Sequence, residues 1–400
     1  MDYTTISADK IFDGNAFLQD GSALRVNEKG FILEILSSQA ASTIENIKKY
    51  EGILLPGLVN AHCHLELSWM HNLIASEKGL CQFIQEVQRV RKNEIREQTI
   101  ASAQRADKEL YASGVSLVGD ICNSDITFQI KANSPIFYHS FIELFGILKD
   151  EADEIVEKGH LLNVSLKNCM GKKAYGSSLS PHAPYSVSKK LFGGILNYNY
   201  KIGAAQSIHV HESQDELDFF LEKESCIENF LANIDRVPDD QSFKGIRPMD
   251  WALAHMSKCN KIVLVHNTVS TSKDIEKALA FSKMLWWCLC PKANLYIEKQ
   301  LPALDVMLNS NLPICIGTDS LASNQSLNLI DELYTLQSHF PQLSLEMMLQ
   351  WITKNGAEAL DLFHQFGKIE VGRQPGICLI RKVDFQSLKL SSDSDSIRII

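Results

Sequence analysis

The sequence predicts an α/β protein with a (β/α)8 TIM-like barrel over residues 55–366 and a small β-sandwich domain built from both termini, residues 1–54 and 367–400. Two observations predict the barrel. Eight short apolar runs alternate with longer amphipathic stretches, which is typical of a parallel sheet whose strands are joined by helices. Several of these runs also end in His, Asp or Glu, and a barrel collects its catalytic groups at the carboxyl ends of its strands. A doubly wound open sheet would instead gather its polar groups at one switch point.

The predicted elements follow in chain order. The expected strands lie at 55–66, 116–121, 136–144, 177–184, 205–212, 262–267, 284–294 and 313–320. The clearest expected helices lie at 80–113, 215–232, 272–281 and 302–310. At both ends of the chain, glycines interrupt short alternating segments, which indicates hairpins. The stretch 391–396, rich in serine and aspartate, is expected to be a turn or loop.

The composition argues against some classes of partner. The net charge of -9 and the pI near 5.8 disfavour nucleic acid or an anionic membrane, because phosphate contacts need clustered Lys and Arg. The first residues lack the features of a signal peptide, and every apolar run is shorter than the ~18 residues that a membrane span needs. The ten cysteines are scattered, so we expect free thiols in a reduced, cytoplasmic protein. A homodimer is compatible with the sequence.

Two histidines separated by one residue end the first predicted strand. Side chains alternate along a strand, so His62 and His64 point to one face and Cys63 points to the other. Two imidazoles on one face at a strand end can bind one metal ion. The alternative is two surface histidines, or one core histidine beside an exposed one.

Other strand ends supply candidate partners for these histidines. A catalytic zinc takes about three or four His or carboxylate ligands and keeps a position for water. The fifth strand offers His209 or His211, which share a face, so their spacing does not decide between them. The eighth strand offers Asp319, which could instead cap a loop.

Two further polar side chains suit proton transfer. Bound water at a metal site becomes acidic, and Glu212 is placed to take and deliver its protons. His266, at the end of the sixth strand, can hold a hydroxide or a developing charge. For Glu212 the alternative is an ion pair with a lysine of the next helix.

An ordered set of motifs resembles the amidohydrolase superfamily. The set consists of 56–64 (PGLVNAHCH), 182–185 (HAPY), His209-x-x-Glu212, 264–267 (LVHN), Cys290-Pro291-x-x-Asn294 and 317–320 (GTDS). These motifs span nearly the whole chain in the family's order. They are similar to the metal-dependent deaminase and chlorohydrolase group, which includes adenosine and S-adenosylhomocysteine deaminases. The segments 65–68 (LELS) and 321–324 (LASN) are similar to aminodeoxyfutalosine deaminases.

The resemblance implies roles for individual residues. One divalent metal ion, zinc or alternatively iron, would be bound by His62, His64, His209 and Asp319. Glu212 would protonate a ring nitrogen, and Asp319 would carry a proton from the hydroxide towards the leaving ammonia. His266 would orient the hydroxide, and His182 would touch the substrate.

The resemblance also bears on the number of metals. Binuclear members carry a bridging lysine at the end of the fourth strand. Here Ser180-Pro181-His182 occupies that strand end, and Lys172 and Lys173 lie upstream in a loop. One metal per chain is therefore expected.

The expected function is a hydrolytic deaminase that releases ammonia from an aminated purine. The first candidate substrate is a 5′-substituted adenine nucleoside such as aminodeoxyfutalosine, with Glu66 and Trp69 covering the part away from the reacting carbon. The alternatives are hydrolysis of another heterocycle (guanine, a pterin, a chlorotriazine or a cyclic amide) and a non-catalytic ligand-binding barrel.

Overall fold

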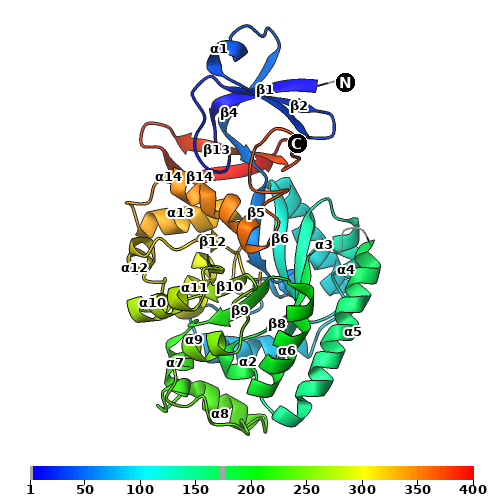
Figure 1. The fold of residues 1–400 in the computed structure, drawn as a ribbon, viewed down its shortest axis with the longest axis vertical. Coiled ribbons are helices and arrows are strands. Elements are labelled where there is room, and N and C mark those ends of the chain that lie inside the picture. The colour runs from blue at the N-terminus through cyan, green and yellow to red at the C-terminus, as the bar shows by residue number, and fades with distance from the viewer. Residues whose placement is uncertain (1–2, 172–175) are drawn as a thin grey trace.

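Eight parallel strands form a closed barrel in the computed structural model, which describes residues 3–171 and 176–400 (Figure 1). Four strands form each half of the barrel. They are β5 (Leu58–Cys63), β6 (Val115–Cys122), β7 (Phe137–Leu144) and β8 (Ser177–Pro181), then β9 (Gln206–Val210), β10 (Ile262–His266), β11 (Leu285–Leu289) and β12 (Ile314–Ile316). A bridge from Cys63 to Asp319 closes one seam, and the backbone N–H of His209 donates to the His182 carbonyl across the other at 2.9 Å. The predicted barrel and all eight predicted strand positions are confirmed.

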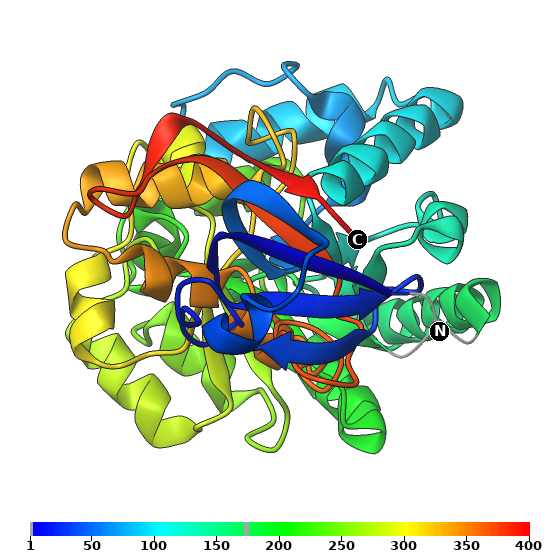
Figure 2. The same cartoon turned by 90° about the horizontal axis from the view of Figure 1, so that it is seen from above.

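These strands are continuous apolar runs because both of their faces are covered. Nearly every strand residue is buried, as expected when helices pack around a parallel sheet. The surrounding helices are visible from above in Figure 2. They include α3 (Arg96–Ala112), α4 (Phe128–Asn133), α5 (Ala152–Met170), α6 (Lys189–Ile202), α9 (Pro248–Ala254), α10 (Ser272–Phe281), α11 (Pro291–Glu298), α12 (Leu304–Asn309), α13 (Leu329–His339), α14 (Leu345–Trp351) and α15 (Lys354–Ala359).

Several predicted strands extend beyond the observed ones, and three predicted elements each contain an unexpected break. The helix at 80–113 is two helices, α2 (Leu80–Arg91) and α3. The helix at 215–232 is also two, α7 (Gln214–Phe220) and α8 (Cys226–Asn233), because Ser225 caps a new N-terminus by accepting from the Ile227 N–H. The run at 284–294 leaves the strand at Leu289, and Pro291 then begins α11.

The two termini form a sheet of their own. Its order is β14-β13-β4-β1-β2-β3, with β1 (Tyr3–Ile11), β2 (Ala23–Asn27), β3 (Ile32–Leu36), β4 (Ile47–Pro56), β13 (Ile377–Asp384) and β14 (Lys389–Arg398). The sheet has a separate apolar cluster that includes Ile6, Leu24 and Leu379. The short helix α1 (Ser38–Ala41) packs at its edge, beside β3. The prediction that the two ends of the chain form a β-structure apart from the barrel is therefore confirmed, and the observed structure is one six-stranded sheet.

The prediction of a turn or loop at 391–396 is wrong. This stretch lies within β14, where Arg381 of β13 opposes Asp395 and binds its carboxylate through two hydrogen bonds of 2.7 Å. Ser394 and Ser396 also donate to backbone carbonyls. Polar composition therefore marks an exposed strand edge here.

The terminal sheet adjoins the amino ends of the barrel strands. Gly57 donates from its backbone N–H to the Gly376 carbonyl at 3.1 Å, and Arg398 donates to the Val115 carbonyl at 2.6 Å. The carboxyl ends of the strands consequently face away from this sheet, and the predicted site lies at the free end of the barrel.

The expectation of ten free thiols is wrong for two cysteines. Cys81 and Cys226 form a disulfide with a Cα–Cα distance of 6.2 Å, while the other eight cysteines are free. The partners are 145 residues apart, and only the folded barrel brings them together.

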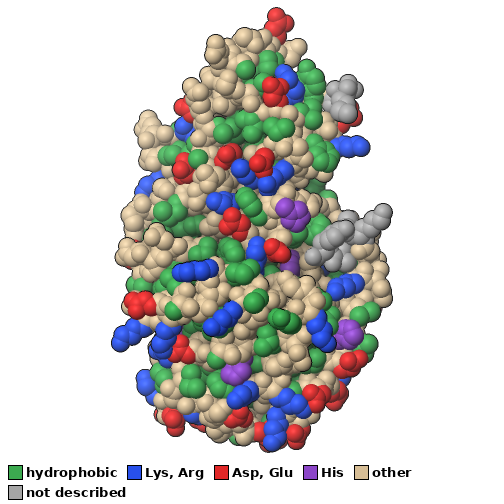
Figure 3. Space-filling view, viewed as in Figure 1, with side chains coloured by type: hydrophobic (Ala, Val, Ile, Leu, Met, Phe, Trp, Pro, Cys, Tyr) green, Lys and Arg blue, Asp and Glu red, His purple; other side chains and the backbone are tan. Residues whose placement is uncertain are grey.

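The surface of the described residues gives two further facts. In the described ranges, no helix is long and apolar enough to cross a bilayer. On the face drawn in Figure 3, Lys and Arg side chains are interspersed with Asp and Glu.

Candidate metal centre

Four predicted ligands converge at the carboxyl mouth of the barrel. The Nε2 atom of His62 lies 3.1 Å from Nε2 of His64 and 3.3 Å from Nε2 of His209. The Asp319 Oδ1 atom lies 3.3 Å from Nε2 of His64 and 3.6 Å from Nε2 of His62. All four side chains are buried. Ligand atoms of His62, His64 and Asp319 lie within 4.8 Å of one another, as do those of His62, His209 and His266, so His62 is common to both groups.

The separations of 3.1 to 3.6 Å between His62 Nε2 and the other three residues are those of neighbouring ligands in a tetrahedral metal site. Ligand bonds of about 2.1 Å place neighbouring ligand atoms about 3.4 Å apart in a tetrahedron. Burial lowers the pKa of His62 to about 3, so its ring is neutral at pH 7 and has a lone pair to offer. Three imidazoles and one carboxylate are ligands that suit zinc or another divalent transition metal.

Neighbouring groups fix the orientation of two of these side chains. The His209 Nδ1–H donates to the His182 carbonyl at 2.9 Å, which leaves the lone pair on Nε2 facing the cluster. Ser323 donates to Asp319 Oδ2, so Oδ1 remains free to face the histidines. Asp319 also adopts φ +55°, a left-handed conformation that non-glycine residues seldom hold outside constrained sites.

The structure separates His209 from His211. The His211 Nε2 atom accepts from the Met249 N–H at 3.3 Å, and its Nδ1 lies 3.0 Å from Ser270 Oγ. His211 has φ +52°, so the chain turns after β9 and the two imidazoles point apart. His211 is a buried structural residue, and His209 belongs to the cluster.

Glu212 and His266 lie beside the four converging groups. Glu212 Oε1 is 3.6 Å from Nε2 of His266. Burial raises the pKa of Glu212 to about 8, and the nearby carboxylates of Asp319 and Glu298 add to this shift. The side-chain oxygen of Asn294 accepts from His266 Nδ1–H at 3.1 Å, so Nε2 faces Glu212. Glu212 can therefore hold a proton at neutral pH next to the cluster.

The predicted substrate-binding residues differ in their surroundings. The ring centroid of His182 lies 5.1 Å from that of His209, at the edge of the cluster. Glu66 and Trp69 lie on the short helix η1 (Leu65–Met70), directly after His64. Glu66 accepts hydrogen bonds from Asn123 and Ser124.

Trp69 lies in an apolar cluster at the start of the chain segment that leads to α2. Its neighbours in that cluster include Met70, Ile74, Val90 and Ala322. The structure therefore brings His182 to the converging groups, whereas Glu66 is hydrogen-bonded to the loop after β6 and Trp69 packs among apolar side chains.

The end of the fourth barrel strand bears on the number of metals. Pro181 ends β8 and His182 follows it. Lys172 and Lys173, which were considered for a bridging role, lie outside the described residues.

Sequence reasoning assigned no role to several groups that support the cluster. Glu143 Oε1 lies 3.6 Å from Nδ1 of His209, and Asp120 Oδ1 accepts from the Leu65 N–H at 2.7 Å, directly after His64. Asn60 and Thr318 tie β5 to the end of β12 through two hydrogen bonds of 2.7 and 3.1 Å. Asp120 and Glu143 could have been found from the sequence, because each is a charged residue at the end of a predicted strand, the second and the third.

The fold and the cluster define a class: α/β-barrel proteins with histidine and carboxylate groups gathered at the carboxyl mouth. The sequence profile of the amidohydrolase family matches residues 53–393, and the chain belongs to this family. It is accordingly a hydrolase that acts on C–N bonds.

Three proteins illustrate the similarity. An adenosine deaminase of Helicobacter pylori is 28% identical over 329 residues, which cover 80% of this chain and 77% of that protein. The structure of Helicobacter pylori aminofutalosine deaminase in complex with methylthio-coformycin matches with a TM-score of 0.82 at 24% identity, over 97% of this chain and 93% of that one. An adenosine deaminase structure from Xanthomonas campestris with bound zinc matches with a TM-score of 0.70 at 19% identity, over 94% and 84% of the two chains.

Proposed function

We propose that this protein is a metal-dependent deaminase that hydrolytically removes ammonia from an aminated purine. The observation that carries the proposal is the placement of Glu212, whose pKa is raised to about 8, beside the converging His62, His64, His209 and Asp319. An acid held next to a metal-ligand set is what hydrolysis of an exocyclic amine requires, because the amine must be protonated to leave. The deaminase names of the similar proteins support the same chemistry.

The proposed cofactor is one divalent metal ion, zinc in the first place and iron as the alternative. Such an ion, when bound, supplies the Lewis acidity that makes water a nucleophile at neutral pH. His62, His64, His209 and Asp319 would hold it, and the separations from His62 Nε2 to the other three support this set. The zinc in the Xanthomonas campestris deaminase structure supports this assignment.

Different side chains carry out the different proton transfers. Glu212 donates its proton to the ring nitrogen beside the reacting carbon, which makes that carbon more electrophilic. Asp319 accepts the proton of the attacking water and passes it to the departing amine. His266, oriented by Asn294, directs Nε2 at the reacting oxygen, and His182 contacts the substrate ring.

The metal assignment predicts a contrast between two neighbouring histidines. The purified protein is expected to contain about one zinc or iron per chain, and chelation is expected to abolish activity. His209→Asn should lose the metal, while the matched variant His211→Asn should keep it, because His211 binds Met249 and Ser270 instead. Elemental analysis measures both. Two tightly bound metals per chain, or equal metal loss in the two variants, would contradict the assignment.

The proposed substrate class is a 5′-substituted adenine nucleoside. Aminodeoxyfutalosine is the first candidate, followed by S-adenosylhomocysteine and methylthioadenosine, and Glu66 and Trp69 are proposed to cover the part beyond the base. The similarity to an aminofutalosine deaminase and an adenosine deaminase favours this class.

A substrate panel tests this class directly. The change in absorbance from adenine to hypoxanthine, with release of ammonia, is expected for at least one adenine nucleoside. Turnover of guanine, a pterin, a chlorotriazine or a cyclic amide without any adenine nucleoside would overturn the substrate class and leave the metal site intact. Binding of these compounds without turnover of any would favour a non-catalytic barrel.

A further inference from the structure

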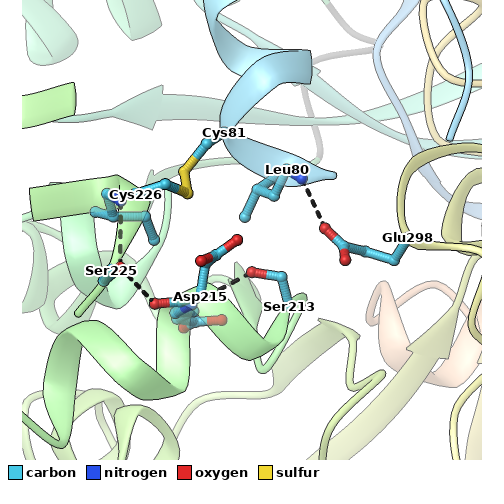
Figure 4. Close-up of a disulfide and its surroundings, with 9 residues drawn as sticks. Leu80, Cys81, Ser213, Asp215, Ser225, Cys226 and Glu298 are labelled. Carbon is cyan, nitrogen blue, oxygen red and sulfur yellow. Dashed lines mark hydrogen bonds between the residues drawn. A yellow bond between two sulfur atoms is a disulfide. The ribbon is translucent and has the colours of Figure 1, made fainter. Parts of the chain in front are cut away.

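The Cys81–Cys226 disulfide joins the start of α2 to the start of α8 (Figure 4). Cys81 is the second residue of α2, which follows β5 and its two histidines. Cys226 is the first residue of α8, which follows β9, His209 and Glu212. Strands β5 and β9 are the first and fifth of eight, so the disulfide connects loops that face each other across the mouth.

Hydrogen bonds connect this disulfide with the surroundings of Glu212. On one side, the backbone N–H of Leu80 donates to Glu298 Oε1 at 2.6 Å, and Glu298 is close enough for its charge to act on Glu212. On the other side, Ser225 donates to the Asp215 carbonyl at 2.9 Å, and Asp215 lies three residues after Glu212. A change in the position of α2 or α8 is thus transmitted to the mouth of the site.

The other cysteines indicate what kind of disulfide this is. Eight of the ten are free, and most of those eight are buried. A protein that relied on disulfides for its framework would pair most of its cysteines, so one disulfide among eight free thiols does not form such a framework. Cys226 is partly exposed, so a reductant can reach one of the two sulfur atoms.

We propose that Cys81 and Cys226 are a thiol–disulfide switch that sets how tightly α2 and α8 close over the substrate. A small dithiol gives two electrons and two protons to the S–S bond, which becomes two thiols, and the dithiol becomes a disulfide. After reduction, α2 and α8 are no longer covalently joined, and the mouth opens more readily. The effect on the substrate rests on the proposed function, while the switch itself does not.

The acidic group beside the disulfide is expected to protect the reduced state. The Asp215 carboxylate lies within 4.8 Å of both sulfur atoms, and its charge disfavours a neighbouring thiolate. Because the thiolate is the species that attacks a disulfide, oxidised glutathione should re-form the Cys81–Cys226 bond slowly. Asp215→Asn is expected to speed this step, which thiol titration follows over time.

The switch is tested on the full-length, metal-loaded protein without any reductant in the assay. Cys81→Ser is expected to raise the KM of the best adenine nucleoside by about fivefold or more with little change in kcat, since the reacting groups stay in place. Cys259→Ser, which removes an exposed free thiol, is the matched control and should change neither. Amide hydrogen exchange should rise in α2 and α8 of Cys81→Ser alone.

Two readouts separate this proposal from the deaminase proposal. Protein treated with oxidised glutathione should titrate as eight thiols, and ten should appear after reduction, whatever the substrate is. Ten thiols under oxidising conditions, or unchanged KM and unchanged hydrogen exchange in Cys81→Ser, would overturn the switch. Uptake of a second zinc ion by the reduced protein, lost in both Cys81→Ser and Asp215→Asn, would also overturn it and assign the pair to a metal site. If the protein deaminated none of the adenine nucleosides, only the substrate assignment would be overturned, because the thiol count and hydrogen exchange would still test the switch.

Discussion

Glu212→Gln is expected to lower kcat by about 100-fold or more while leaving the metal content unchanged. Glutamine keeps the shape of the side chain and its place beside His266, but it has no acidic proton to donate to the ring nitrogen. The metal should stay because Glu212 lies beside the converging Nε2 and Oδ1 atoms and is not one of them. Steady-state kinetics with the best nucleoside and elemental analysis of the same preparation measure the two quantities.

A surface carboxylate provides the control for this result. Glu157, on α5, has a side chain that is 67% exposed, so Glu157→Gln should leave kcat unchanged. Turnover of Glu212→Gln close to that of the unmodified protein would show that another group donates the proton. Loss of the metal together with activity would instead make Glu212 a ligand.

The strand positions of the barrel could be read from the sequence because a buried parallel strand must be apolar along its whole length. Helix ends were harder to place. The break before α8 depends on a single cap, Ser225, within a stretch that is amphipathic on both sides of it. The division of the chain after residue 54 and before residue 367 stays a prediction, although β4 runs on to Pro56 within the terminal sheet.

The part of the candidate site that could be predicted is the set of polar residues at the ends of the predicted strands. Alternation placed His62 and His64 on one face, and this is where they lie. The same rule put His209 and His211 together, and it failed because the chain leaves β9 at Val210 and His211 adopts φ +52°. His64 also lies one residue beyond its strand, β5, but it has φ -121°. The face of a residue just past a strand end therefore depends on its backbone angles, which alternation in the sequence does not give.

Contacts between distant segments were beyond sequence reasoning. The Cys81–Cys226 disulfide and the Asn60–Thr318 hydrogen bonds join residues 145 and 258 positions apart. No short sequence pattern predicts either pair, because the two partners lie on or after different strands of the barrel. The barrel geometry therefore had to be known before either contact could be inferred.

A buried ion pair behind the cluster carries the largest expected effect on stability. Lys131 Nζ lies 2.5 Å from Asp120 Oδ2, and neither side chain is exposed. Burial alone would lower the pKa of Lys131, but the charge of Asp120 raises it above its ordinary value, so the lysine is charged. Asp120 Oδ1 in turn accepts from the Leu65 N–H directly after His64, so the pair also fixes the backbone beside the ligand set.

Lys131→Met is therefore expected to lower the free energy of unfolding by about 3–5 kcal/mol, because it leaves the Asp120 carboxylate buried without a counter-charge. The comparison is Lys190→Met, which breaks an exposed pair with Asp153 of the same 2.5 Å length and should cost about 1 kcal/mol or less. Denaturant unfolding followed by circular dichroism measures both. The double variant Lys131→Met with Asp120→Asn should recover much of the loss, since it removes the unpaired charge while the amide oxygen can still accept from Leu65. Equal destabilisation in the single and double variants would show that the loss comes from other contacts of Lys131, such as its ammonium group over the Tyr138 ring, and not from the unpaired Asp120 charge.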